Sequence, residues 1–180
     1  MEAEKVLAEI EEMTKNGFLP IIGPIKGSFL ADLINKYKPK SALEIGSLVG
    51  YSTILIALNL PAGSKLTTIE KSPGLVKIAK RNIEKAGLPE KVKVVEGDAI
   101  KVIPKIKANF DFVFLDAEKS EYLDYLRLIE PKMAKKCIVV ADNVGVFKTT
   151  LSDYLTYVKK NYKSRTHDFG FDAIEVSVKK

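Results

Sequence analysis

Two aspartates and an asparagine follow two short apolar segments at matching places. Asp116 comes directly after the run 110–115, and Asp142 and Asn143 come directly after the run 137–141. Neighbouring parallel strands lie about 5 Å apart, so two such strands would bring the carboxylates and the amide together. Carboxylates this close raise each other's pKa unless a cation compensates their charge. Because hard divalent cations such as Mg²⁺ take oxygen ligands, these three residues form a candidate metal site.

Each aspartate also has a simpler interpretation. Aspartate is common after a strand because its side chain caps the next helix, and for Asp116 or Asp142 alone this explanation is equally good. The pair, together with Asn143 and Lys119, favours a site. Lys119 is expected at a helix start, where the helix dipole and a divalent ion would both favour its neutral amine. It is therefore the candidate general base, with a surface lysine paired to a neighbouring glutamate as the alternative.

A glycine-bounded turn precedes these residues in the chain. The segment 44–52 reads Glu-Ile-Gly-Ser-Leu-Val-Gly-Tyr-Ser. Gly46 and Gly50 let the backbone turn sharply and approach a ligand, and the helix that follows offers free N–H groups to a carboxylate. The dinucleotide and Walker patterns are both absent, because Leu48 and Tyr51 stand at glycine positions and no Gly-Lys-Ser/Thr follows. A structural turn without a ligand is the alternative.

Two further acidic residues end the next two expected strands. Glu70 lies 24 positions after Gly46, where a carboxylate can accept both hydroxyls of a ribose. Asp98, between Gly97 and Ala99, could bracket an adenine. Both carboxylates could instead cap the helices that follow them, and the two roles are compatible.

Short apolar runs alternate with amphipathic segments, which is typical of an α/β fold with a mostly parallel sheet. Strands are expected at 42–45, 65–69, 92–95, 110–115, 137–141, 164–167 and 173–178. Helices are expected at 2–15, 26–37, 50–59, 72–87, 99–106, 120–134 and 149–162. This pattern predicts a single domain over 1–180, with a helical cap at 1–38 and an antiparallel last strand. Ligands bind beyond the carboxyl ends of the strands in such sheets, where the polar residues above are expected.

Composition bounds the remaining possibilities. Of the 180 residues, 46% are hydrophobic and 29% charged, as in ordinary globular proteins. No apolar run reaches the roughly 18 residues that cross a bilayer, so we expect no membrane partner. A single cysteine, Cys137, excludes an internal disulfide, favours a cytoplasmic location and is expected to be a buried, inert thiol. The net charge of +6 permits nucleic-acid binding, but the lysines are spread along the chain as on a solvated surface.

Taken together, these motifs resemble the class I S-adenosylmethionine-dependent methyltransferases. More narrowly, the chain is similar to the cation-dependent O-methyltransferases typified by catechol and caffeoyl-CoA O-methyltransferases. The similarity runs from about residue 23 to residue 143 and returns at 172–178. Its most specific segments are Leu43-Glu44-Ile45-Gly46, Gly50-Tyr51-Ser52, Gly97-Asp98-Ala99, 114–119 with Tyr122, and Asp142-Asn143-Val144. The resemblance implies a Rossmann-like seven-stranded sheet with helices on both faces.

The resemblance also implies roles for the matching residues. S-adenosylmethionine would be held at its methionine end by Ile22 and Ser52 near Glu44, and Mg²⁺ or another divalent cation by Asp116, Asp142 and Asn143, with Lys119 as the base. The full set expected to bind the methyl donor is Ile22, Glu44, Gly46, Gly50, Ser52, Glu70, Lys71, Gly97, Asp98, Ala99 and Asp116.

The acceptor is less defined. The resemblance favours a small vicinal dihydroxy aromatic such as a catechol, whereas some bacterial relatives methylate a hydroxylated uridine in tRNA, which the positive charge would suit. A regulatory or scaffold protein that only binds the cofactor is a non-enzymatic alternative. The short connection from Asn143 to Thr150 predicts a pocket that is open or completed by a second subunit, as in a homodimer. Phe169 and Phe171 could line the acceptor pocket or close the core.

Overall fold

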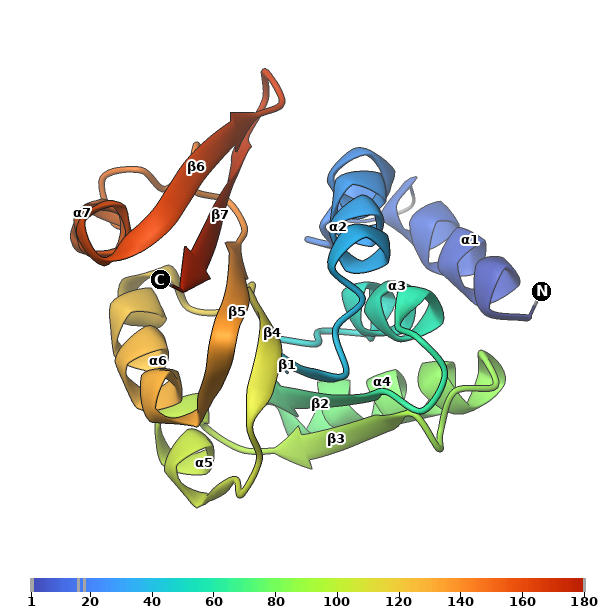
Figure 1. Cartoon of the computed structure of the whole chain (residues 1–180). Helices are drawn as coiled ribbons and strands as arrows, with labels where there is room; N and C mark the ends of the chain where they lie inside the picture. Colours follow the sequence, from blue (N-terminus) through green and yellow to red (C-terminus); the bar gives the residue numbers. More distant parts are fainter. Residues whose placement is uncertain (1, 16, 18, 180) are drawn as a thin grey trace.

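The computed structural model describes residues 2–15, 17 and 19–179 and consists of one mixed sheet between two layers of helices (Figure 1). The strand order is β3-β2-β1-β4-β5-β7-β6. Strands β1 to β5 pair in parallel, and β7 pairs antiparallel with both β5 and β6, so the predicted fold class is confirmed. The bounds are β1 (Ser41–Ile45), β2 (Lys65–Glu70), β3 (Val92–Glu96), β4 (Phe110–Leu115), β5 (Met133–Ala141), β6 (Tyr162–Asp168) and β7 (Ala173–Lys179).

The position of the site follows from this strand order. The chain starts in the middle of the sheet at β1, builds outward to β3, and then returns to the other side of β1 at β4. The connections after β1 and β4 therefore leave the sheet in opposite directions. A crevice forms where they part, beyond the carboxyl ends of the strands.

Helices cover both faces of the sheet (Figure 1). On one face lie α1 (Glu2–Lys15), α2 (Gly23–Tyr37), α3 (Tyr51–Asn59) and α4 (Pro73–Lys85), and on the other α5 (Ala99–Val102), α6 (Tyr122–Ile129) and α7 (Ser152–Asn161). Short 3₁₀ segments complete the second layer: η1 (Ile103–Lys105), η2 (Lys119–Glu121) and η3 (Glu130–Lys132). None of these described helices is both long and apolar enough to cross a membrane.

The central strand β4 shows why both faces must be covered. Its side chains alternate, with Phe112 and Phe114 in the core under α1–α4 and Val113 and Leu115 in the core under α5–α7. All four are fully buried. A parallel strand with two apolar faces is stable only between two helical layers.

The structure corrects several predicted boundaries. The helix predicted at 120–134 is wrong at its end, because α6 stops at Ile129 and β5 already begins at Met133. Pro131 lies in the 3₁₀ turn between them, where it cannot donate the hydrogen bond that would continue the helix. Helix α2 begins at Gly23 rather than at 26, since Pro24 suits a first turn, and α7 begins at Ser152 rather than at 149.

Candidate active site

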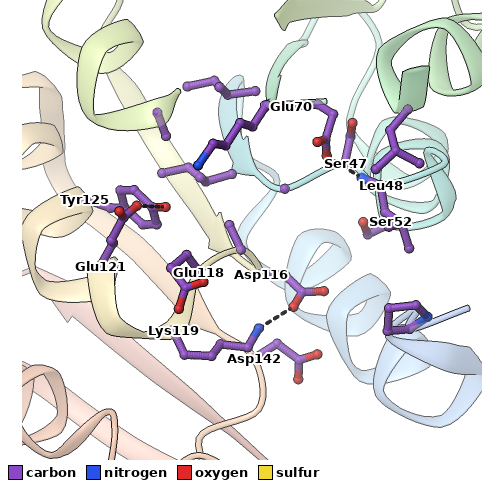
Figure 2. A pocket seen from close by; sticks show the side chains of 18 of the residues that line it. Ser47, Leu48, Ser52, Glu70, Asp116, Glu118, Lys119, Glu121, Tyr125 and Asp142 are labelled. Atoms are coloured by element: carbon purple, nitrogen blue, oxygen red, sulfur yellow. Dashed lines mark hydrogen bonds and ion pairs between the residues drawn. The ribbon is translucent and has the colours of Figure 1, made fainter. Parts of the chain in front are cut away.

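A cavity of about 580 Å³ lies beyond the carboxyl ends of β1 to β5 (Figure 2). A cavity of this size suits a ligand of a few hundred daltons. The predicted site residues that line it are Ile22, Gly46, Ser52, Glu70, Lys71, Gly97, Asp98, Ala99, Asp116, Lys119, Asp142 and Asn143. Glu44 and Gly50 are not on its wall, because Glu44 is fully buried and Gly50 lies against Ala79 of α4.

The turn after β1 requires its first glycine. Gly46 has a φ of 94°, and a Cβ atom at this position would lie 2.2 Å from the backbone oxygen of Asp116. Only glycine therefore allows the turn to pass this close to the end of β4. The turn leads directly into α3, whose N-cap residue, Gly50, has no side chain to satisfy the first backbone N–H groups. These N–H groups form a potential anion-binding site.

Glu70 connects this turn to the end of β2. Its Oε1 accepts a hydrogen bond from the backbone N–H of Ser72 at 2.9 Å. Its Oε2 accepts one from the backbone N–H of Leu48 at 3.0 Å (Figure 2). The capping interpretation is thus correct for Glu70. It is also correct for Asp98, which accepts from the backbone N–H of Ile100 at 3.0 Å. A carboxylate oxygen has two acceptor sites, so capping leaves Glu70 able to accept from a ligand hydroxyl as well.

Glu44 is a fully buried carboxyl group next to the cavity. Complete burial raises its pKa to about 7, although the hydroxyls of Ser52, Thr53 and Thr68 favour the ionised form. Thr53 donates to Oε2 at 2.5 Å, whereas Oε1 has no hydrogen-bond partner within the described part of the chain. An unpaired buried oxygen is costly, and because this atom is not on the cavity wall, a ligand could pair with it only after the residues that cover it had moved.

At the other end of the cavity, Lys119 contacts the first predicted metal ligand. Its Nζ donates to Oδ1 of Asp116 at 2.9 Å and to the hydroxyl of Tyr122 at 3.0 Å. The glutamates proposed as alternative partners bind elsewhere, Glu118 to Ser120 and Glu121 to Tyr125. Lys119 is therefore part of the cavity wall, with its amino group beside Asp116 (Figure 2).

The second predicted metal ligand is paired with a residue that the sequence interpretation missed. Lys26 of α2 is only 4% exposed, and its Nζ lies 2.7 and 2.9 Å from the two carboxylate oxygens of Asp142. Burial and the charge of Asp116 nevertheless raise the pKa of Asp142 to about 6. One signal for Lys26 was present in the sequence. It is spaced by four residues from Leu30 and by eight from Ile34, so it shares the buried face of its helix.

Asp172, just before β7, is another missed member of the site. It accepts a hydrogen bond from Lys26 at 2.7 Å, from the side-chain amide of Asn143 at 2.8 Å and from the backbone N–H of Val146 at 3.0 Å. Burial opposes ionisation of this carboxyl, but these donors outweigh it and hold the pKa of Asp172 below its usual value. The connection after β5 is thus fixed to the start of β7 by a carboxylate.

Phe147 is an exposed aromatic residue on the cavity wall, which Tyr51 and Tyr125 also line. Its side chain is 41% exposed, and the centre of its ring lies 5.9 Å from Nζ of Lys119. Of the two phenylalanines predicted as candidates, Phe169 packs against Phe29 and the core, and Phe171 is 57% exposed beside a second hollow. The core interpretation is therefore correct for Phe169, and neither residue lines this cavity.

The candidate metal site contains only two charged side chains, Asp116 and Asp142. Among residues 2–15, 17 and 19–179 there is no group of three or more His, Cys, Asp or Glu side chains that could hold a metal ion. Asp116 and Asp142 lie in one cavity, where the charge of Asp116 raises the pKa of Asp142, and the amide of Asn143 on the same wall could supply a third oxygen. Two carboxylates and an amide oxygen are ligands that Mg²⁺ accepts in proteins.

Comparison with known proteins identifies the family of the chain. Residues 1–160 match the family profile described as O-methyltransferase. The chain belongs to this family. It is 38% identical to catechol O-methyltransferase B of Danio rerio over 152 residues, which cover 79% of this chain and 57% of the relative. It is 36% identical to catechol O-methyltransferase of Niastella koreensis, again over 79% of this chain and over 67% of the relative.

Solved structures share the fold. The O-methyltransferase from Bacillus cereus in complex with SAH superposes with a TM-score of 0.86 at 24% identity, covering 98% of this chain and 91% of that chain. TomG, an O-methyltransferase from Streptomyces achromogenes in complex with SAM, gives 0.87 at 22% identity, covering 98% and 90%. The resemblance drawn from the sequence motifs is confirmed at the level of family and fold. The chain spans little more than half the length of the Danio rerio relative.

Proposed function

We propose that the protein transfers the methyl group of S-adenosylmethionine to a hydroxyl oxygen of a small vicinal dihydroxy aromatic, such as a catechol, with a divalent cation bound. The observation that supports this proposal is a single cavity with two chemically different ends. The glycine turn and Glu70 lie at one end, and Asp116, Asp142 and Asn143 lie at the other. The two relatives reported above both carry the name catechol O-methyltransferase.

The first end has the groups that the methyl donor requires. Glu70 would accept the ribose hydroxyls, Asp98 and Ala99 would flank the adenine, and the N-terminus of α3 would face the methionine carboxylate. Glu44 lies beneath this end without reaching the cavity wall, so Ser52, which lines the cavity above it, would hold the donor's methionine end. All of these groups are held by backbone contacts or by burial, so little reorganisation would accompany binding.

The second end would position and deprotonate the acceptor. Asp116, Asp142 and Asn143 would hold the cation, which when bound supplies the Lewis acidity that lowers the pKa of an acceptor hydroxyl. Lys119 would hold the departing proton on Nζ, and Tyr122 keeps that atom in place through its hydroxyl. Phe147 offers an exposed ring face at the mouth for an aromatic acceptor. The chain's contribution to the rate would come mainly from orientation of the reacting groups.

The test is mass spectrometry of a catechol panel and of total tRNA, each incubated with the protein and isotopically labelled methyl donor. We expect methylated catechol with Mg²⁺ present, no product in excess chelator, and a rate lower by roughly 100-fold or more in Asp142→Asn. Asp168→Asn, which changes an exposed carboxylate at the end of β6, is the control and should keep the wild-type rate.

Three outcomes would contradict parts of the proposal. Product formation that persists in chelator would exclude the cation. Methylated uridine in tRNA without any catechol product would replace the acceptor. Binding of the donor without product in either arm would favour a regulatory or scaffold protein. A homodimer and a cytoplasmic location remain predictions.

A further inference from the structure

Asp172 lies behind the candidate metal ligands rather than among them. It is 7% exposed, is absent from the wall of the candidate active site, and precedes β7 at the far end of the sequence. Its Oδ2 accepts from Nδ2 of Asn143 and from Nζ of Lys26, and its Oδ1 accepts from the backbone N–H of Val146. Asn143 and Val146 belong to the connection that follows β5, so this one carboxylate fixes both the side chain and the backbone of that connection.

The hydrogen bond between Asp172 and Asn143 determines which end of the amide faces the cavity. A carboxylate oxygen in this position accepts hydrogen bonds, so the group that faces Asp172 has to be the NH₂ of Asn143. The carbonyl oxygen then points away from Asp172. Only this oxygen can ligate a cation, because an amide NH₂ group has no free acceptor site. An asparagine without such a partner could present either end.

Lys26 makes the arrangement possible despite the burial of two acidic groups. Asp142 and Asp172 are 1% and 7% exposed, and the ammonium group of Lys26 lies between them. Without the ammonium group of Lys26, the two buried carboxylates would repel each other. A rearrangement of the loop that moved Asp172 away from Asp142 would then be favoured. Lys26 therefore allows Asp172 to remain in place beside Asn143.

We propose that Asp172 is a positioning residue which, supported by Lys26, orients the amide oxygen of Asn143 toward the divalent cation. This inference rests on the proposed function, because it assumes that Asp116, Asp142 and Asn143 bind a metal ion. Partners that orient the ligands of a metal site commonly change its affinity by about 10- to 100-fold when they are removed.

The test is the affinity of the full-length protein for Mn²⁺, measured by electron paramagnetic resonance or calorimetry without acceptor. Asp172→Ala should weaken Mn²⁺ binding by at least about tenfold. Its affinity for S-adenosylmethionine should stay within about twofold of wild type, because the donor end of the cavity is held by other contacts. Asp168→Ala is the matched control, since its carboxylate lies nearby at the end of β6 but accepts, among the described residues, only from the backbone N–H of Gly170.

A second background separates orientation from a general structural effect. In Asn143→Asp the two side-chain oxygens are equivalent, so no partner is needed to choose between them. Adding Asp172→Ala to this variant should cost less than about threefold in Mn²⁺ affinity. An equal loss in both backgrounds would overturn the orienting role. Unchanged Mn²⁺ affinity in the single variant would do the same while leaving the proposed function intact.

A measurement on the wild-type protein covers the case in which Asp172→Ala does not fold. The side-chain NH₂ of Asn143, assigned by its disappearance in Asn143→Asp, should exchange slowly with solvent and stay protected after diamagnetic Mg²⁺ is added. Exchange at the rate of an unstructured peptide would overturn the inference. If wild-type protein binds no Mn²⁺ at all, the metal-dependent part of the proposed function fails, and this inference fails with it.

Discussion

The two ends of the cavity are built in different ways. At the donor end, polar groups are held by the backbone of nearby loops, as when Glu70 accepts from Leu48 and Ser72. At the acceptor end, they are held by ionic contacts between side chains that lie far apart in the sequence, as when Lys26 pairs with Asp142 and Asp172. The first end depends on the shape of the chain, and the second depends on the balance of its charges.

This difference has a physical consequence for binding. A shape fixed by the backbone is present before any ligand arrives, so it presents hydrogen-bond donors and acceptors at little cost. Buried charges are kept in place only while each has a partner, so their arrangement responds to any cation that enters. The donor end is thus expected to be sensitive to steric changes, and the acceptor end to changes of charge.

The largest effect is expected from a steric change at the donor end. Gly46→Ala would place a Cβ atom 2.2 Å from the backbone oxygen of Asp116 at a φ of 94°. Because neither backbone can move without disturbing β1 or β4, we expect a loss of more than about 5 kcal/mol in the free energy of unfolding. Urea denaturation would measure it.

Gly63→Ala is the control for this substitution. Gly63 also has a positive φ, of 78°, but its Cβ would meet nothing within 4 Å. It should therefore lose only about 1 kcal/mol, the cost of the left-handed conformation alone. Similar losses at both glycines would show that the close approach of the two loops is not what the donor end depends on.

A somewhat smaller effect is expected from a charge change at the acceptor end. Lys26→Met would leave Asp142 and Asp172 buried without their common cation, which should cost about 4 kcal/mol in the free energy of unfolding. Lys85→Met is the control, because the salt bridge of Lys85 with Glu9 is exposed and should contribute less than about 0.5 kcal/mol. Denaturation of both variants in the same buffer gives the comparison. If Lys26→Met were as mild as its control, the acceptor end would not depend on charge balance.

The smallest effect is a pH dependence that comes from Glu44, the fully buried carboxyl group beneath the donor end. The pKa of Glu44 is raised from 4.5 to about 7 by burial, so the folded state binds its proton more tightly than the unfolded state. Its contribution to stability is greatest below about pH 4.5 and is lost as the pH rises through about 7. Between about pH 5 and pH 8 the wild type should lose roughly 2.5 kcal/mol more than Glu44→Gln.

The measurement is chemical denaturation of both proteins across this pH range. Parallel profiles would show that Glu44 titrates normally in the folded protein. They would also show that burial does not raise the pKa of this carboxyl group.

Most of the fold and the site contacts between residues close in the sequence could be predicted from the sequence. Glu70 and Asp98 are bound by residues two positions away, and Asp116 contacts Lys119 three positions away, so motif spacing carries this information. The end of α6 was missed although Pro131 marks it, because Met133 to Lys136 are good helix formers and only the pairing of Met133 with Phe110 of β4 shows that the next strand begins there. Phe147 was missed because nothing local separates an aromatic at a cavity mouth from one in a loop.

By itself the sequence determined the alternation of strands and helices, the glycine turn and the placing of acidic residues at strand ends, because each depends on local geometry or on a short repeat of apolar residues. Only the tertiary structure decided that a lysine of the second helix would lie between Asp142 and Asp172, 116 and 146 positions further along the chain. It also decided which end of the Asn143 amide would face the cavity. These contacts depend on the packing of distant elements, and electrostatic pairing at that range leaves no spacing in the sequence by which it could be recognised.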